Sequence, residues 1–150
     1  MRILVDADAC PQTVMELLGA EALKRNLEVL FVTSLAHVRE EERWQGYQFL
    51  IVDQLPEAVD LAIANRLRSG DLVVTQDYGL AALALGRGAL ALSPSGLIYD
   101  DDNIGALLSW RHLSAVQRRK GARVRGNIRD LKPQELLRFQ DALNKVLGFG

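Results

Sequence analysis

The chain has 150 residues, of which 49% are hydrophobic and 25% charged, and its formal net charge is −1. This length and composition predict one soluble domain with a buried core, spanning residues 1–150. No run approaches the roughly 20 apolar residues needed to cross a bilayer, and the N-terminus lacks the pattern of a signal peptide. We therefore expect a cytoplasmic protein without a membrane partner.

The few cysteines and histidines limit the metal chemistry that the chain can support. The single cysteine, Cys10, excludes an internal disulfide. The two histidines, His37 and His112, lie far apart in sequence, which leaves a structural zinc site almost without ligands. A bound metal should therefore be held by oxygen atoms.

Short apolar runs rich in branched residues alternate with helical patterns along the first hundred residues. Strands are expected at 2–6, 27–33, 47–53, 71–75 and 88–92, and helices at 11–25, 55–68 and 79–86. This alternation predicts a parallel sheet of about five strands with helices on both faces. The connection 34–46 is too polar for a core element, so we expect an extended loop or a short edge strand there.

Two further helices are expected after the last strand, at 101–119 and at 133–147, the second beginning with a proline that suits a first helical turn. The segment 118–132 between them holds seven basic residues against one acid, Asp130. Such a run attracts phosphate, although a solvated surface loop would explain it equally well. The residues that we expect to contact a nucleic-acid backbone are Arg118, Arg119, Lys120, Arg123 and Arg125.

Acidic residues follow several of the predicted strands. Asp6 ends the first strand, Asp8 comes two residues later, Asp53 ends the third strand and Asp77 follows the fourth. In an open parallel sheet, the carboxyl ends of the strands form one edge where ligands bind, so these acids should emerge together. Asp60 lies on the helix after the third strand, either on its solvent side or leaning toward the same edge. For Asp77 and Asp53, a helix cap or a turn is the structural alternative.

Converging carboxylates repel one another unless a cation lies among them, and Mg²⁺ or Mn²⁺ is the natural choice. Such a site suits phosphodiester hydrolysis. Thr75, at the end of the fourth strand, could bond a phosphate or a metal-bound water, and Ser93, after the fifth, could contact substrate. An aspartate-based phosphatase is a rival, with Asp6 as nucleophile and Asp8 as general acid, or with Asp53 as a phosphate acceptor. Both rivals normally use a later lysine, and "ALALSPSG" contains none.

Four segments together resemble the YaiI/YqxD family of bacterial proteins, over essentially the whole chain. They are "VDADACP", "VDQLPEAVDLAI", "GDLVVTQDYGLAALALGRGALALSPSGLIYDDDNI" and "FQDALNKVL". That family is similar to the PIN-like and NYN nucleases, which use Mg²⁺ or Mn²⁺ held by acids at the end of a parallel sheet. The resemblance implies a three-layer PIN-like domain and a metal-dependent nuclease that acts on nucleic acid, with RNA expected as substrate in preference to DNA. It implies Asp6, Asp8, Asp60 and Asp77 as the catalytic, metal-binding acids.

One departure from this pattern leaves a second function open. PIN-like nucleases often carry a further acid two residues after the acid that follows the fourth strand, and this chain has Gly79 there. A module that binds metal and nucleic acid without cleaving is therefore the alternative to the nuclease.

Overall fold

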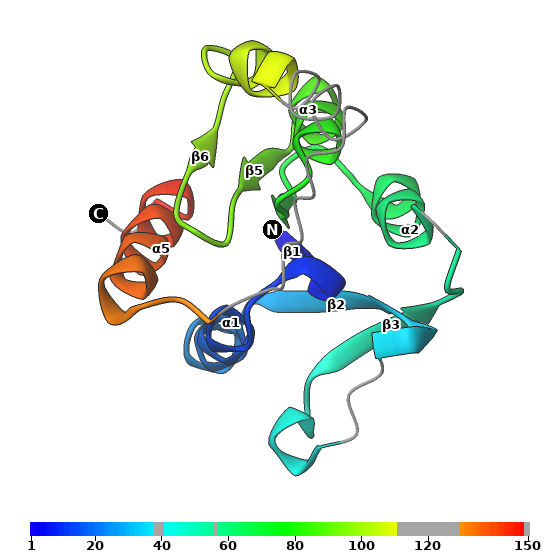
Figure 1. The fold of residues 1–150 in the computed structure, drawn as a ribbon. Coiled ribbons are helices and arrows are strands. Elements are labelled where there is room, and N and C mark those ends of the chain that lie inside the picture. The colour runs from blue at the N-terminus through cyan, green and yellow to red at the C-terminus, as the bar shows by residue number, and fades with distance from the viewer. Residues whose placement is uncertain (38–40, 56, 111–129, 149–150) are drawn as a thin grey trace, which may run out of the picture.

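A six-stranded sheet forms the centre of the computed structural model, which describes residues 1–37, 41–55, 57–110 and 130–148 (Figure 1). The strands are β1 (Arg2–Asp6), β2 (Glu28–Ser34), β3 (Gln48–Val52), β4 (Leu72–Val74), β5 (Leu90–Leu92) and β6 (Ile98–Tyr99). Their order in the sheet is β3-β2-β1-β4-β5-β6. All paired neighbours from β3 to β5 are parallel, and β6 is antiparallel to β5.

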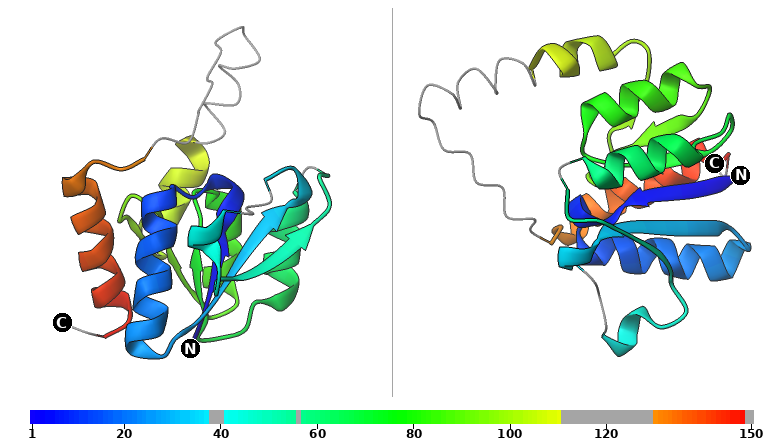
Figure 2. Two further views of the ribbon diagram at one scale, coloured as in Figure 1. Left: turned by 90° about the horizontal axis from the view of Figure 1, so that it is seen from below. Right: turned by 90° about the vertical axis from the view of Figure 1, so that its right-hand side faces the viewer.

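Helices cover both faces of this sheet, so the domain has three layers (Figure 2). One face carries α1 (Gln12–Arg25) and α5 (Pro133–Val146), and the other carries α2 (Ala58–Arg66) and α3 (Tyr78–Gly86). Residues 104–110 are also helical. Within the described part of the chain, no helix has the length and apolar character to span a bilayer. The expected three-layer α/β fold, with its mainly parallel sheet, is confirmed.

Strand β1 shows why the middle of a central strand is apolar without alternation. Ile3 and Val5 pack into the core under α1 and α5, together with Phe139 of α5. Leu4, between them, packs into the opposite core with Ile63 of α2. A central parallel strand is buried on both faces, and each fully buried Leu or Ile contributes about 1.5–3 kcal/mol.

Several boundaries differ from those that the sequence predicts. The described residues of the connection after β2 include 3₁₀ turns at Leu35–His37 and Glu42–Trp44 and form no edge strand, and β3 itself lies at one edge of the sheet. Helix α2 begins at Ala58 instead of residue 55, because Glu57 has a left-handed backbone (φ 66°) that cannot continue a right-handed helix. The two-residue strand β6 is absent from the prediction, since it is too short for a periodic pattern.

The C-terminal part of the prediction is described only partly. The expected helix at 101–119 is present at 104–110, and α5 matches the expected helix at 133–147 within a residue. The predicted phosphate-contacting residues lie outside the described residues; they are Arg118, Arg119, Lys120, Arg123 and Arg125.

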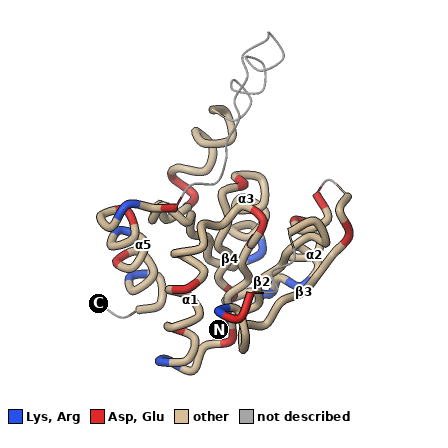
Figure 3. The backbone as a smooth tube through the Cα atoms, turned by 60° about the horizontal axis from the view of Figure 1, so that its bottom comes forward, with Lys and Arg blue, Asp and Glu red and all other residues tan. Residues whose placement is uncertain are grey.

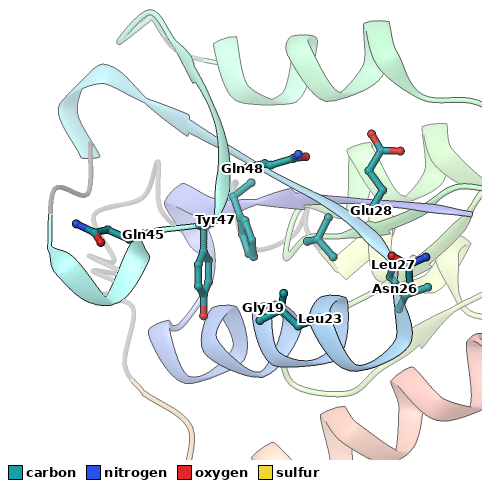
Figure 4. Close-up of a pocket in the computed structure, with 11 residues that line it drawn as sticks. Gly19, Leu23, Asn26, Leu27, Glu28, Gln45, Tyr47 and Gln48 are labelled. Atoms are coloured by element: carbon teal, nitrogen blue, oxygen red, sulfur yellow. The ribbon is translucent and has the colours of Figure 1, made fainter.

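An aromatic cluster packs between α1 and the start of β3. The ring of Tyr47 points toward α1 beside Gly19 (Figure 4). A Cβ atom at Gly19 would lie 2.4 Å from Tyr47 Cζ, so only glycine admits the ring at this distance. Tyr47 also meets Trp44 edge-on at 5.2 Å between ring centroids and lies 5.3 Å from the Phe31 ring. These contacts attach the edge strand to the helix layer.

Candidate functional site

Asp6 is the most deeply buried acid at the carboxyl edge of the sheet. It ends β1, is only 6% exposed, and accepts a hydrogen bond of 3.1 Å from Thr75 Oγ1. The pKa of Asp6 is raised to about 6, chiefly by burial and to a smaller extent by the nearby charges of Asp8 and Asp77, against the lowering effect of the hydrogen bond from Thr75. Asp6 thus lies among other carboxylates, where its charge is disfavoured.

Asp77 has two structural tasks. Its Oδ1 accepts hydrogen bonds from Gly79 N (2.8 Å) and Leu80 N (3.2 Å), so it is the N-cap of α3. Its own backbone N–H donates to Thr75 Oγ1 at 3.0 Å, and this hydroxyl in turn donates to Asp6. The capping alternative for Asp77 is therefore correct, and the cap places the same carboxylate close to Asp6 and Asp60.

Asp60 lies in the first turn of α2, and its carboxyl group is close to those of Asp77 and Asp6. Burial raises the pKa of Asp60 to about 7, helped by a hydrogen bond with Asp77 and by the charges of Asp77, Asp6 and Glu57. Two carboxyl groups can share a hydrogen bond only when one of them holds a proton. The structure therefore brings together Asp6, Asp60 and Asp77, which we call the acid cluster.

Asp8 lies beside the acid cluster but is held by β2. It accepts hydrogen bonds from Thr33 Oγ1 (2.7 Å) and Ser34 N (3.0 Å), and its Oδ2 lies 3.5 Å from His37 Nδ1. Burial alone would raise the pKa of Asp8, but the hydrogen bonds from Ser34 and Thr33 and the charge of His37 outweigh it and lower the pKa. The hydrogen bonds from β2 thus stabilise the charged form of Asp8.

The two hydroxyl side chains predicted to meet substrate make hydrogen bonds within the protein. Thr75 is 1% exposed and links Asp6 to the start of α3, as described above. Ser93 accepts from Leu97 N at 3.0 Å and bonds Ser95 Oγ at 2.9 Å, which closes the turn between β5 and β6. Asp53 follows the edge strand β3 and is exposed. The charges that raise the pKa of Asp6 are those of Asp8 and Asp77, and those that raise the pKa of Asp60 are Asp77, Asp6 and Glu57; Asp53 is in neither group.

A hollow of about 340 Å³ opens beside the acid cluster. Asp60 and Asp8 both line it, together with a side chain that sequence reasoning missed, His37. Its residue type was visible in the sequence, but its placement beside Asp8 depends on the turn that follows β2. The remaining lining residues are Ser34, Ala36, Gln54, Leu55, Glu57, Ala58 and Val59.

The donor set of the acid cluster can be compared with the needs of a metal ion. Its members offer only carboxylate oxygens, which are the ligands that Mg²⁺ and Mn²⁺ prefer. The pKa values of Asp6 and Asp60 are raised first by burial and then by neighbouring carboxylates, and a cation would offset both effects. As the side chains lie, no group of three or more His, Cys, Asp or Glu within the described residues has the geometry of a metal site. The chemistry of these carboxylates fits a hard divalent ion.

Comparison with known proteins assigns the family. Residues 4–148 match the model described as "Uncharacterized BCR, YaiI/YqxD family". The chain belongs to this family. YaiI/YqxD relatives described as UPF0178 proteins include one from Alkaliphilus metalliredigens, 43% identical over 147 residues and covering 98% of this chain and 92% of the relative. Another, from Clostridium novyi, is 46% identical over 148 residues, with 99% and 95% covered. The resemblance seen in the sequence is therefore confirmed.

A search of solved structures finds a weaker likeness. The crystal structure of Rae1 (YacP) from Bacillus subtilis, as its W164L mutant, aligns over 97% of this chain and 99% of that chain. The TM-score is 0.47 and the sequence identity 14%. At these values, no conclusion about the activity of the YaiI/YqxD chain follows from the alignment.

Proposed function

We propose that this protein is a metal-dependent nuclease that hydrolyses phosphodiester bonds. Its cofactor would be Mg²⁺ or Mn²⁺, and its preferred substrate would be RNA rather than DNA. The observation that supports it is the acid cluster. Three carboxylates from three separate elements, the end of β1, the first turn of α2 and the N-cap of α3, meet at the carboxyl edge of a parallel sheet. Ligands bind at this edge in open α/β sheets.

The chemistry of the cluster favours a cation. The folded protein holds Asp6 and Asp60 with pKa values of about 6 and 7, so at neutral pH the ionised cluster carries charge that its surroundings disfavour. A divalent ion held by Asp6, Asp60 and Asp77 would polarise a phosphodiester and lower the pKa of an attacking water. Thr75 would keep Asp6 oriented, and the α3 cap would keep Asp77 in place.

A basic surface would hold the rest of the substrate. We propose that the arginines and lysine of the segment after residue 117 contact the phosphate backbone; they are Arg118, Arg119, Lys120, Arg123 and Arg125. Helix α5, which follows this segment, contains two further basic residues, Arg138 and Lys145. Figure 3 shows basic positions on this helix in blue.

The phosphatase alternative has less support from the same residues. Asp6 would need to present a carboxylate oxygen to a phosphorus atom, yet its side chain is almost fully buried and accepts the Thr75 hydroxyl. The segment from β5 through the following turn, where such enzymes place a balancing lysine, contains none. The acid cluster is therefore better suited to hold an ion than to act as a nucleophile.

The test is cleavage of labelled single- and double-stranded RNA and DNA by the purified full chain with Mn²⁺, Mg²⁺ or EDTA. We expect cleavage with either ion, none in EDTA, and a loss of at least about a hundredfold in Asp6→Asn, because one ligand of the ion is removed. Asp53→Asn, which removes an exposed acid outside the cluster, is the matched control and should retain full activity. Salt-sensitive binding of nucleic acid without any cleavage would instead support the non-catalytic module.

A further inference from the structure

The imidazole of His37 is held in a defined orientation at the wall of the hollow beside the acid cluster. His37 ends the 3₁₀ turn Leu35–His37, which directly follows β2. Its Nδ1 lies 3.0 Å from Ser34 Oγ and 3.5 Å from Asp8 Oδ2. One edge of the ring is thus fixed by two polar groups.

The groups that hold His37 are themselves fixed to the sheet. Asp8 is bonded to both the backbone N–H of Ser34 and the hydroxyl of Thr33, at the last two positions of β2. The parallel register places Val32 opposite Asp6, which brings this end of β2 beside Asp8. A rigid path therefore leads from the central sheet through Asp8 to the imidazole ring.

The hollow connects this ring with the acid cluster. Asp8 and His37 line one side, and the first turn of α2, including Asp60, lines another. Its volume of about 340 Å³ falls within the range of small-ligand sites and would admit one nucleotide. The side chain of His37 is 57% exposed, so a ligand in the hollow can reach the ring.

The charges around the hollow single out His37. Three of the lining side chains are carboxylic acids, Asp8, Glu57 and Asp60, and they repel a phosphate. Among the described residues that line the hollow, His37 is the one with a ring N–H that can donate to a phosphate oxygen. A phosphate in the hollow would therefore find a favourable contact at this imidazole.

We propose that His37 contacts the substrate, donating a hydrogen bond from Nε2 to a phosphate oxygen of the nucleotide bound in this hollow. Asp8 and Ser34 act as positioning residues through Nδ1. An imidazole N–H is a hydrogen-bond donor and a phosphate oxygen is an acceptor, so the two form a hydrogen bond when the ring is held in place. This inference rests on the proposed nuclease function for its substrate class, and it assigns Asp8 to His37 rather than to the metal.

The first measurement is binding without cleavage. A fluorescein-labelled ten-nucleotide single-stranded RNA is titrated with the full chain in Ca²⁺, and the Kd is read from anisotropy. We expect His37→Ala to raise the Kd about tenfold, which corresponds to about 1.4 kcal/mol. His37→Gln, which keeps an amide N–H near the position of Nε2, should recover part of this loss. Leu35→Ala changes another exposed residue of the same turn and should leave the Kd unchanged.

The second measurement observes the ring directly. The chain has two histidines, so a ¹⁵N–¹H spectrum of the imidazoles is readily assigned with a His112→Gln variant. Addition of the same RNA should shift the Nε2 signal of His37. Asp8→Asn should shift its Nδ1 signal in the free protein and weaken RNA binding, whereas a purely structural role for Asp8 would leave the ring signals of the folded variant unchanged.

The outcomes separate this proposal from the nuclease itself. If wild type cleaves RNA and folded His37→Ala has the same Kd and the same cleavage rate, the role of His37 is overturned while the proposed nuclease function is supported. A His37 shift and a tenfold weaker His37→Ala complex without any cleavage supports the contact while the nuclease fails. Failure of wild type to bind the RNA, or binding that leaves the His37 signals unmoved, also overturns the proposal.

Discussion

Replacement of Asp6 by asparagine should stabilise the metal-free protein at neutral pH. Asn has nearly the shape of the protonated acid and can accept the Thr75 hydroxyl, but it carries no charge into the buried cluster. Asp6 is 6% exposed, and its pKa is raised from 3.8 to about 6. At 1.36 kcal/mol per pKa unit, ionising this group in the folded protein costs about 3 kcal/mol relative to the unfolded chain.

The dependence on pH gives this prediction its sign. Because the folded protein holds the Asp6 proton more tightly than the unfolded chain, wild-type stability falls as the pH rises through the window from 3.8 to about 6. The advantage of Asp6→Asn should therefore be near zero at pH 4 and reach about 3 kcal/mol at pH 7.5.

Urea unfolding in EDTA at several pH values measures this difference. Asp53→Asn removes an exposed acid and should show no such pH-dependent gain. The reasoning about the acid cluster would be refuted if Asp6→Asn were less stable than wild type at pH 7.5, or if its advantage were the same at pH 4 and pH 7.5.

Three further predictions address the ion, the cap and the helix layer. Mn²⁺ at a hundredfold its Kd should stabilise wild type by about 2.7 kcal/mol in thermal unfolding and leave the stability of Asp6→Asn unchanged. Calorimetry should show weaker Mn²⁺ binding at pH 5.5 than at pH 7.5, because the ion displaces protons from the acid cluster. Equal affinities at the two pH values would contradict this reasoning. Asp77→Ala removes the N-cap of α3 and should lower the free energy of unfolding by about 1 kcal/mol. Asp77→Asn still caps the helix, so it should keep the wild-type stability but lose Mn²⁺ affinity. A large loss of stability in both variants would argue against the cap as the cause. Gly19→Ala should destabilise the protein by about 1–3 kcal/mol in urea unfolding, because the added Cβ meets the Tyr47 ring. Gly86→Ala, with open space around it, should leave the stability unchanged or raise it. Equal effects of the two substitutions would contradict the packing argument.

The strands and the layers follow from the sequence because burial on both faces demands continuous apolar runs. Residues 2–6 form β1 as predicted, and the same pattern locates β2 and β3 within a residue or two. The placement of Asp6 and Asp77 at one edge also follows, since parallel strands end together. The start of α2 does not, because the left-handed backbone of Glu57 has no signature in its residue type.

The partners of the acids were decided by the tertiary structure. Asp6 and Asp8 are two residues apart in the sequence. The register of β1 against β2 allows Asp8 to accept hydrogen bonds from Thr33 and Ser34, whereas Asp6 accepts one from Thr75. The sequence predicted that acids gather at the sheet edge, because strand direction is a local property of the chain. The different surroundings of Asp6, which is buried, and Asp8, which lies beside His37, arise only in the packed sheet. There, hydrogen bonds join residues that are 25 and 69 positions apart in the sequence.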